Sequence, residues 1–299
     1  MISEYKEKAC AKVNLILKCT GFMPNGYHRL FTVMRELGLS DELTVSIDDG
    51  KCGDIRVRVP GRSDIDNKDN ICYKAASRFF ERLGKDIPDM DIKIEKQVPS
   101  EAGLGGGSSD AAAVLRILSK HCNEPLSKEE LNAIAASTGA DVPFFLEGGC
   151  ALCEGAGEIL TPIKSSPSIP ALILRAPKGV STPACYKAFD ELGESSFDEE
   201  RYKSLINKMD RGENLLDIIR EEKDLFVNDL ERPAVNFVPQ IADLTALLYD
   251  CGASFAMMSG SGSAVFGLFD DEEKALRGYE KALSDERARD CLSFVTKLL

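Results

Sequence analysis

The chain has 299 residues, 43% of them apolar, and its 37 Lys and Arg against 49 Asp and Glu give a formal net charge of −12. At roughly 150 residues per domain this length predicts about two domains, each with enough apolar residues for a buried core, which excludes a disordered chain. The acidic charge argues against non-specific binding to nucleic acid or anionic membrane, so a polyanionic ligand needs a local pocket. Backbone N–H groups and a few lysines can form one, because the field at a ligand is set locally.

Targeting signals are not evident in the sequence. Residues 1–8 are charged and lack the apolar segment of a signal peptide, and no apolar run reaches the roughly 18 residues that span a bilayer. We therefore expect a cytoplasmic protein. Its 10 cysteines are scattered among apolar neighbours and are expected to be buried free thiols. Only Cys150 and Cys153 have C-x-x-C spacing, and no second pair completes a zinc site.

Extended segments open the chain. Nearly unbroken apolar runs predict strands over residues 11–17 and 31–39. Alternation of apolar and polar residues over 43–47, 55–59 and 92–94 is typical of half-buried strands. Together these segments predict a mostly antiparallel or mixed sheet.

Three helices are expected in the first half. An amphipathic segment follows a polar stretch and predicts a helix over residues 71–83, and a second helix is expected to begin near Ser108. The capping box of Ser127 and Glu130 marks the start of a third helix, which is expected to end at Gly139.

The second half has a different order of elements. The predicted elements are short strands after Gly149, a strand over 171–174, helices near 182–191, 199–209 and 233–249, strands around 255–258 and 264–269, a helix over 275–283 and a strand over 292–295. This order indicates an α+β domain with helices layered on a small antiparallel sheet. The Pro- and Ser-rich loop 164–170 places the domain boundary near residue 165, dividing the chain into 1–165 and 166–299.

The strongest local signal is the segment 99–110, PSEAGLGGGSSD, between a predicted strand and a predicted helix. Four glycines within residues 103–107 allow positive φ angles and close approach of the backbone to a ligand. The following helix points its free N–H groups at the same place, as in a phosphate-binding loop. The segment is neither a Walker A loop nor a dinucleotide-binding fingerprint. A tight turn is the structural alternative, although a turn rarely needs four glycines.

A second cluster of glycine and serine, residues 258–263, lies between two predicted strands. By itself it is compatible with a hairpin turn, because glycine and serine dominate such turns. The presence of two glycine clusters in one chain makes a simple hairpin turn a less favoured interpretation of the second.

Three segments resemble the three motifs of the GHMP kinases, the family of galactokinase and of homoserine, mevalonate and phosphomevalonate kinases. They are residues 11–15 (AKVNL), 99–109 and 259–262. Further segments are similar to the branch of this family that acts on a substrate carrying cytidine diphosphate: residues 26–28 (GYH), 69–75 (DNICYKA), 139–145 (GADVPFF), 155–158 (GAGE) and 228–231 (NDLE). The resemblance runs from residue 11 to residue 266.

The resemblance implies a two-domain α+β fold. Its N-terminal domain would be a ribosomal-protein-S5-like mixed sheet with helices, and its C-terminal domain an α/β-plait-like antiparallel sheet with helices. The implied reaction is ATP-dependent phosphorylation of the 2-hydroxyl of a methylerythritol linked to cytidine diphosphate, in non-mevalonate isoprenoid precursor synthesis. ATP and Mg²⁺ are the implied cofactors, and the partner is this small molecule, with no nucleic acid or membrane. Monomer and homodimer both stay open.

For catalysis the resemblance points to Lys12 and Asp141. Asp141 would be the base that accepts the proton of the attacking hydroxyl, and Pro143 is expected to keep Val142 extended, so that the carboxylate is presented from a rigid corner. Lys12 would lie near Asp141 and the γ-phosphate and would take up developing charge. Without this context, Asp141 is compatible with an ordinary turn residue and Lys12 with a solvated strand lysine, although Lys12 is the single cation of an apolar run.

Binding residues for ATP are implied in the same way. The β- and γ-phosphates would be wrapped by the amides of Gly103, Leu104, Gly105, Gly106, Gly107, Ser108 and Ser109. Ser108 or Ser109 would lie near Mg²⁺. Asn70 and Lys96 resemble contacts to the adenosine side.

The substrate would be bound by five residues. Asn14, on the strand face of Lys12, is expected to hydrogen-bond the polyol, and Thr182 to contact the substrate phosphates. The resemblance assigns Tyr27 a stacking role against the pyrimidine, His28 the contacts to its edge, and Tyr186 the opposite face.

One residue departs from the family pattern, because Glu101 places a carboxylate close to the expected triphosphate. An inward carboxylate would repel ATP, so Glu101 is expected to face solvent or to pair with a cation such as Lys96. Two other functions stay open: another GHMP kinase of mevalonate or homoserine type, which has no use for residues 26–28, and a non-catalytic nucleotide-binding sensor. The presence of both Lys12 and Asp141 argues against the sensor.

Overall fold

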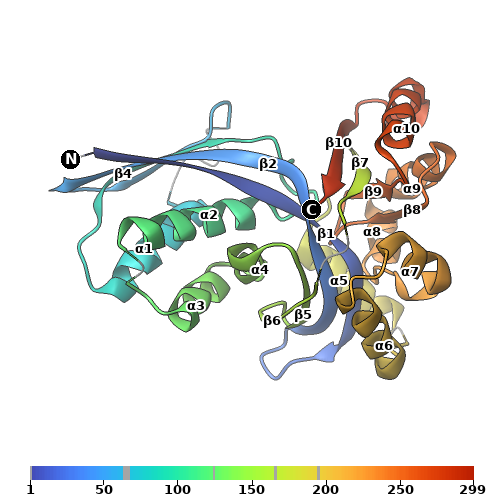
Figure 1. Ribbon diagram of the computed structural model, residues 1–299, viewed down its shortest axis with the longest axis horizontal. Helices are drawn as coiled ribbons and strands as arrows, with labels where there is room; N and C mark the ends of the chain where they lie inside the picture. The colour runs from blue at the N-terminus through green and yellow to red at the C-terminus, as the bar shows by residue number, and fades with distance from the viewer. Residues whose placement is uncertain (1, 63–67, 124, 165–166, 194–195) are drawn as a thin grey trace. The chain divides into compact units, whose positions relative to one another are not determined.

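A computed structural model describes residues 2–62, 68–123, 125–164, 167–193 and 196–299 (Figure 1). The chain divides into two compact units built from interleaved segments. Unit 1 comprises Met1–Ala11, Ser40–Val98 and Gly105–Gly148, and unit 2 comprises Lys12–Leu39, Pro99–Leu104 and Gly149–Leu299. The predicted domain boundary near residue 165 falls on residues 165–166, which lie outside the described residues, and it stays a proposal.

Two long strands contribute to both units. β1 (Ile2–Phe22) and β2 (His28–Cys52) pair with each other, and they contain the first three predicted extended segments. Each strand crosses from one unit to the other, β1 between Ala11 and Lys12 and β2 between Leu39 and Ser40.

The sheet of unit 1 is mixed, as predicted. β4 (Pro88–Glu95) is antiparallel to the end of β2, and β3 (Ile55–Arg58) is parallel to β4. Apolar side chains alternate along these strands and are buried on one face. Figure 1 shows that the helices of unit 1 gather on one side of its strands. These helices are α1 (Ile71–Leu83), α2 (Gly106–His121), α3 (Lys128–Thr138) and α4 (Val142–Glu147).

Local capping explains where these helices begin and end. The capping box predicted for α3 is present, and Gly139 ends that helix as expected. Helix α4 was not predicted. The prediction that Pro143 keeps Val142 extended is wrong, because Val142 is the first residue of helix α4. Proline is tolerated in the first turn of a helix, where its missing N–H has no intrahelical acceptor.

Unit 2 contains antiparallel strand pairs. β5 (Cys150–Gly155) pairs with Leu30–Arg35 of β2 and with β6 (Ile159–Pro162). A further set follows the order β10–β7–β9–β8 and joins β2 where Leu298 lies opposite Leu37. Its strands are β7 (Ile169–Arg175), β8 (Phe255–Met258), β9 (Ala264–Leu268) and β10 (Leu292–Leu298), close to the predicted ranges.

Several helices of unit 2 pack their apolar residues against this sheet in one core that includes Leu172, Val265 and Leu244. These helices are α5 (Thr182–Leu192), α8 (Glu231–Phe237), α9 (Gln240–Asp250) and α10 (Glu272–Ser284). Unit 2 also contains α6 (Glu199–Asp210), α7 (Leu215–Glu221) and short 3₁₀ turns at Lys223–Leu225 and Glu286–Ala288. The single helix predicted over 233–249 is instead α8 and α9, divided at Val238 and Pro239. Proline disfavours a helical residue before it, which accounts for the break.

The sequence predicts that the cysteines are buried free thiols. Cys150 and Cys153 are buried free thiols in β5, and burial raises the pKa of Cys150 to about 11. Four cysteines differ from the prediction: Cys52 is exposed, and Cys10, Cys122 and Cys291 are only half-buried. None of the helices in the described part of the chain is both long enough and apolar enough to cross a membrane.

Candidate active site

Lys12 is a buried cation at the start of the unit 2 portion of β1. Only 3% of the residue is exposed. Its Nζ donates to Asn14 Oδ1 at 2.5 Å and to the backbone oxygen of Gly103 at 3.0 Å, and its own N–H donates to Leu104 O at 3.0 Å. Burying an ammonium is costly unless acceptors replace the lost water. Lys12 is therefore not a solvated strand lysine, and it ties β1 to the glycine-rich segment.

Asn14 is held in one orientation by its neighbours. Its Nδ2 donates to Thr32 Oγ1 at 2.8 Å, and that hydroxyl donates to Ile16 O at 2.6 Å. Because Oδ1 then faces Lys12, the amide presents its acceptor to the ammonium and its donor to β2. Sequence reasoning missed Thr32, whose role depends on strand pairing.

The second glycine-serine cluster packs directly on the first. Ser259 Oγ donates to Gly103 O at 2.9 Å, and a Cβ at Gly103 would lie 2.0 Å from Ser259 O. Gly103 also has a φ of +75°, so two independent constraints require glycine there. Residues 258–263 are thus both the turn between β8 and β9 and a support for the glycine-rich segment.

Asn228 holds the backbone of residues 258–260 by hydrogen bonds. Its Nδ2 donates to the backbone oxygens of Met258 and Gly260 at 2.9 and 2.8 Å. The next residue, Asp229, accepts from Lys18 Nζ at 2.8 Å in a pair whose side chains are both at least 94% buried. Sequence reasoning gave neither residue a role, although both lie in the NDLE segment that carries the resemblance.

In unit 1 the glycine-rich segment continues into helix α2. Gly105 precedes the helix with a φ of +72°, and in the described structure no side chain caps the first N–H groups of α2. These groups belong to Gly106, Gly107 and Ser108, and they have no intrahelical acceptor. The positive end of a 16-residue helix is therefore presented with its donors uncapped, as a phosphate requires.

The two serines of the loop differ in their surroundings. Ser109 is 1% exposed, and its hydroxyl donates to Gly106 O at 2.8 Å. Ser108 is only half-buried. Of the two serines, Ser108 is the more exposed residue.

Lys96 belongs to a buried cluster directly behind the loop. Its Nζ lies 2.5 Å from Asp41 Oδ2 and 2.9 Å from Asp110 Oδ2, and a Cβ at Gly106 would lie 3.2 Å from the same nitrogen. Asp41 Oδ1 accepts from two backbone N–H groups at the end of β4, at 2.6 and 2.8 Å. The cluster therefore joins β2, the end of β4 and the first turn of α2. Sequence reasoning had considered Lys96 without its carboxylate partners.

This cluster has two carboxylates and one ammonium. Burial raises the pKa of Asp110 to about 8. The charge of Lys96 lowers this pKa, but the charge of Asp41 raises it and so opposes the effect of Lys96. Asp110 Oδ1 is also buried without a hydrogen-bond partner among the described residues. Although burial lowers the pKa of Lys96, the carboxylates of Asp110 and Asp41 outweigh it, so the pKa of Lys96 is raised and it stays charged.

Glu101 is exposed, which confirms that it faces solvent. It does not use Lys96, whose ammonium is held by the cluster described above. Instead its side chain lies against Gly179, where a Cβ would be 3.1 Å from Glu101 Oε2.

Asp141 stands at the start of α4 within unit 1. It is half-buried, and its carboxylate does not cap the helix. Gly139, two residues earlier, packs beside the N-terminus of α1 and the start of α2: a Cβ there would lie 3.2 Å from Ile71 Cδ1 and 3.8 Å from Ser108 Oγ. Asn70 caps α1 at this point by accepting from Cys72 N at 2.8 Å. Unit 1 thus brings together the segment of Asp141, Asn70 and the end of the glycine-rich segment that begins α2.

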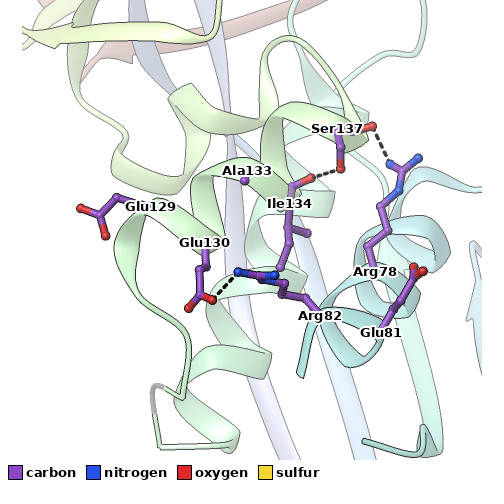
Figure 2. Close-up of a pocket in the computed structure, with 8 residues that line it drawn as sticks. All are labelled: Arg78, Glu81, Arg82, Glu129, Glu130, Ala133, Ile134 and Ser137. Atoms are coloured by element: carbon purple, nitrogen blue, oxygen red, sulfur yellow. Dashed lines mark hydrogen bonds and ion pairs between the residues drawn. The ribbon is translucent and has the colours of Figure 1, made fainter. Parts of the chain in front are cut away.

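A surface hollow lies between α1 and α3. Figure 2 shows Arg78 reaching from α1 to the end of α3, where it donates to Ser137 O at 2.7 Å, and Arg82 paired with Glu130 at 2.6 Å. The charges that line the hollow are of both signs and include Glu129. It contains none of the predicted site residues, so we do not assign it to the nucleotide.

The predicted pyrimidine contacts lie in unit 2. The ring of His28 stacks on Tyr186 with centroids 4.6 Å apart, whereas Tyr27 is 65% exposed. Thr182 Oγ1 lies 2.7 Å from Ser261 Oγ, so α5 begins at the second glycine-serine cluster. The predicted site residues are divided between the two units. Unit 2 contains Lys12, Asn14, Gly103, Leu104, Thr182, His28 and Tyr186. Unit 1 contains Asn70, Lys96, Gly105–Ser109 and Asp141.

Two family models match the chain: "GHMP kinases N terminal domain" over residues 70–149 and "GHMP kinases C terminal" over residues 202–286. The 4-diphosphocytidyl-2-C-methyl-D-erythritol kinase of Desulfitobacterium hafniense (strain Y51) is 38% identical over 294 residues, which cover 96% of this chain and 93% of that protein. The same-named kinase of Clostridium botulinum (strain Eklund 17B / Type B) is 39% identical over 279 residues, covering 92% and 94%.

Comparison with solved structures also finds similar proteins among the GHMP kinases. A crystal structure of 4-(cytidine 5′-diphospho)-2C-methyl-D-erythritol kinase matches with a TM-score of 0.78 and 31% identity, over 98% of this chain and 99% of that one. Homoserine kinase from Cytophaga hutchinsonii matches with a TM-score of 0.71 at 18% identity, over 99% and 94%, which is a likeness of fold alone.

Proposed function

The chain belongs to the GHMP kinase family, and from this premise we propose that it transfers the γ-phosphoryl group of ATP to the 2-hydroxyl of 4-diphosphocytidyl-2-C-methyl-D-erythritol. The relative at 38% identity over 96% of the chain bears the name of this kinase. Within the molecule, the observation that carries the proposal is the buried ammonium of Lys12 against the backbone oxygen of Gly103. A cation kept dry beside a glycine-rich loop suits the developing charge of phosphoryl transfer.

The phosphates of ATP are held by backbone donors in this proposal. The uncapped N–H groups of Gly106, Gly107 and Ser108 point along α2 at the β- and γ-phosphates, and the helix dipole favours the negative charge. These donors are fixed by the helix before ATP arrives, so binding requires little reorganisation. Gly103, Leu104, Gly105 and Ser109 complete the loop. Asn70 and Lys96 lie on the adenosine side.

Lys12 and Asp141 carry the chemistry. Asp141 accepts the proton of the 2-hydroxyl as that oxygen attacks the γ-phosphorus and the bond from the γ-phosphorus to ADP breaks, releasing ADP, while Lys12 stabilises the charge on the transferred group.

The substrate is bound by the remaining residues. The amide nitrogen of Asn14 uses one hydrogen for Thr32 and has a second for the polyol. Thr182 contacts the diphosphate, Tyr27 and Tyr186 stack on the cytosine, and His28 contacts its edge.

Mg²⁺ also fits this loop. Mg²⁺ in kinases is typically held by one or two protein ligands together with substrate phosphates and water. Ser108, the more exposed of the two serines, is the residue that would contact it, rather than Ser109. When bound, Mg²⁺ neutralises charge on the β- and γ-phosphates. A cytoplasmic location and a division of the chain near residue 165 are further parts of the proposal.

A phosphoryl-transfer assay tests the proposal. Purified protein with radiolabelled ATP should label 4-diphosphocytidyl-2-C-methyl-D-erythritol and leave mevalonate and homoserine unlabelled. In a parallel thermal-shift assay, CDP should raise the melting temperature, because a ligand that binds only the folded state stabilises it. Transfer to mevalonate or homoserine, with no shift by CDP, would instead favour another GHMP kinase. Stabilisation by nucleotides with no transfer to any acceptor would indicate a sensor.

A further inference from the structure

Helix α5 presents two side chains, one helical turn apart, to the ring of His28. Tyr186 stacks on the imidazole with centroids 4.6 Å apart and ring planes at 28°. Asp190 Oδ1 lies 2.7 Å from His28 Nε2. Phe22 of β1 lies on the same imidazole with its centroid 4.7 Å away. The side chain of His28 is only 15% exposed, so both the position and the orientation of its ring are fixed by these neighbours.

The contact with Asp190 decides which nitrogen of the neutral imidazole carries hydrogen. An ionised carboxylate can only accept hydrogen bonds, so Nε2 must be the donor. In the neutral ring Nδ1 then has a lone pair and acts as an acceptor. Among the residues that the structure describes, Nδ1 of His28 has no hydrogen-bond partner.

We propose that Asp190 is a positioning residue that selects cytosine over uracil by holding His28 as the Nε2–H tautomer. The inference rests on the proposed function, in which His28 contacts the edge of the pyrimidine. Cytosine presents an exocyclic amino group, which can donate to Nδ1. Uracil presents a carbonyl oxygen at the same position, which would face the lone pair of Nδ1 and leave two acceptors opposed. The cost of such an unsatisfied contact corresponds to roughly a tenfold to hundredfold preference for cytosine.

The first test compares kcat/KM for the cytidine-linked substrate and its uridine-linked analogue. The wild type should prefer the cytidine compound at least about tenfold, and Asp190→Ala should reduce that ratio to about threefold or less. Using the ratio cancels changes that affect both substrates equally, such as a general weakening of substrate binding. Glu191→Ala is the matched control, because it removes the next carboxylate of the same helix, which is exposed. This control should keep the wild-type ratio.

The second test reads the tautomer without any substrate. The chain has two histidines, so a His121→Gln variant leaves His28 as the only imidazole in a ¹⁵N spectrum. At a pH where His28 is neutral, Nε2 should show the chemical shift of a protonated nitrogen and Nδ1 that of an unprotonated one. Adding Asp190→Ala should move both shifts toward those of a tautomer mixture.

An unchanged cytidine-to-uridine ratio in Asp190→Ala, or an Nδ1–H tautomer in the otherwise wild-type spectrum, would overturn the role of Asp190. Absence of transfer to the cytidine-linked substrate in the wild type is a different outcome, since it contradicts the proposed function itself. Thermal unfolding of Asp190→Ala shows whether the variant is folded, and the spectrum of the double variant gives a result even where activity is too low to measure.

Discussion

Lys12 shows how much a single residue can indicate and where that indication ends. Its place as the one cation in an apolar run predicted an unusual lysine. The sequence could not show that its acceptors are a side chain two residues away and a backbone oxygen 91 residues away. That second acceptor exists only because the glycine-rich segment returns to β1 in the folded chain.

Replacing Lys12 by methionine should lower kcat by about a hundredfold or more, because a fixed charge at the transferred phosphoryl group is lost. Steady-state kinetics check this. Lys8→Met is the matched control, since Lys8 lies on the same strand and is exposed. Near-wild-type kcat in Lys12→Met would remove Lys12 from the chemistry.

Asp141→Asn should also lower kcat by about a hundredfold or more while ATP still binds, because the amide keeps the shape of the side chain and loses its basicity. Kinetics and ATP titration calorimetry measure the two effects separately. Glu147→Gln, at the exposed end of α4, should leave both unchanged. Unchanged turnover in Asp141→Asn would contradict its role as base.

At the scale of elements, the glycine-rich segment has two parts with different requirements. Gly103 is confined by Ser259 and by its positive φ, whereas a Cβ at Gly107 would meet only Ile71 Cγ2 at an ordinary 3.6 Å. The sequence showed four glycines without indicating which of them the fold requires, since that depends on a turn far along the chain.

Gly103→Ala should therefore lower the free energy of unfolding by about 2 kcal/mol or more, through overlap with backbone and a strained φ. Gly107→Ala should change it by less than about 1 kcal/mol, and in the stabilising direction, because alanine is the better helix former. Urea denaturation compares the two variants. Equal losses would show that the close approach of Ser259 to Gly103 is not a constraint.

The cluster of Lys96, Asp41 and Asp110 makes stability depend on pH. The folded-state pKa of Asp110, about 8, lies above the ordinary value for aspartate, so the folded protein binds an extra proton between about pH 4 and pH 8. The contribution of Asp110 to the free energy of unfolding is therefore greatest below about pH 4, and it is lost as the pH rises to 8.

Asp110→Asn removes this titration and keeps an oxygen for Lys96. Relative to the wild type, the variant should gain stability as pH rises, by about 1–3 kcal/mol between pH 5 and pH 8. Urea denaturation at several pH values measures the difference. A difference that stays constant with pH would show that Asp110 is ionised throughout this range.

At the scale of the whole molecule, the two compact units are not two halves of the chain. β1 and β2 each contribute to both, and the glycine-rich segment passes from unit 2 to unit 1 between Leu104 and Gly105. The division near residue 165 stays a proposal, and it rests on a local signal, a loop rich in proline and serine. The interleaved units could not be found in this way, because they are defined by contacts between distant segments.

This interleaving predicts a single cooperative unfolding transition. Neither unit can unfold without disrupting strands that also belong to the other. Pulsed hydrogen exchange read by mass spectrometry along a urea gradient should give the same midpoint for peptides of α1, in unit 1, and of α9, in unit 2. Midpoints that differ by more than about 0.5 M would show that the units unfold separately.

Much of the fold followed from local patterns. The α+β class, the capping box of α3, the range of α1 and most strands of the second half were predicted correctly, because periodicity and caps act over a few residues. The two short helices, α4 and α7, were missed because six or seven residues are too few to establish a period. The division of α8 from α9 depended on a single proline that the apolar pattern concealed.

The sequence by itself determined the family, and it supplied the proposals of a phosphate-binding loop and of the catalytic residues, because these depend on residue type and local spacing. Only the tertiary structure decided that Lys12 is buried against Gly103, that Lys96 is held by two carboxylates and that Asp190 contacts His28. The physical reason is that burial and pairing of charge depend on segments far apart in the chain, and folding alone brings those segments together.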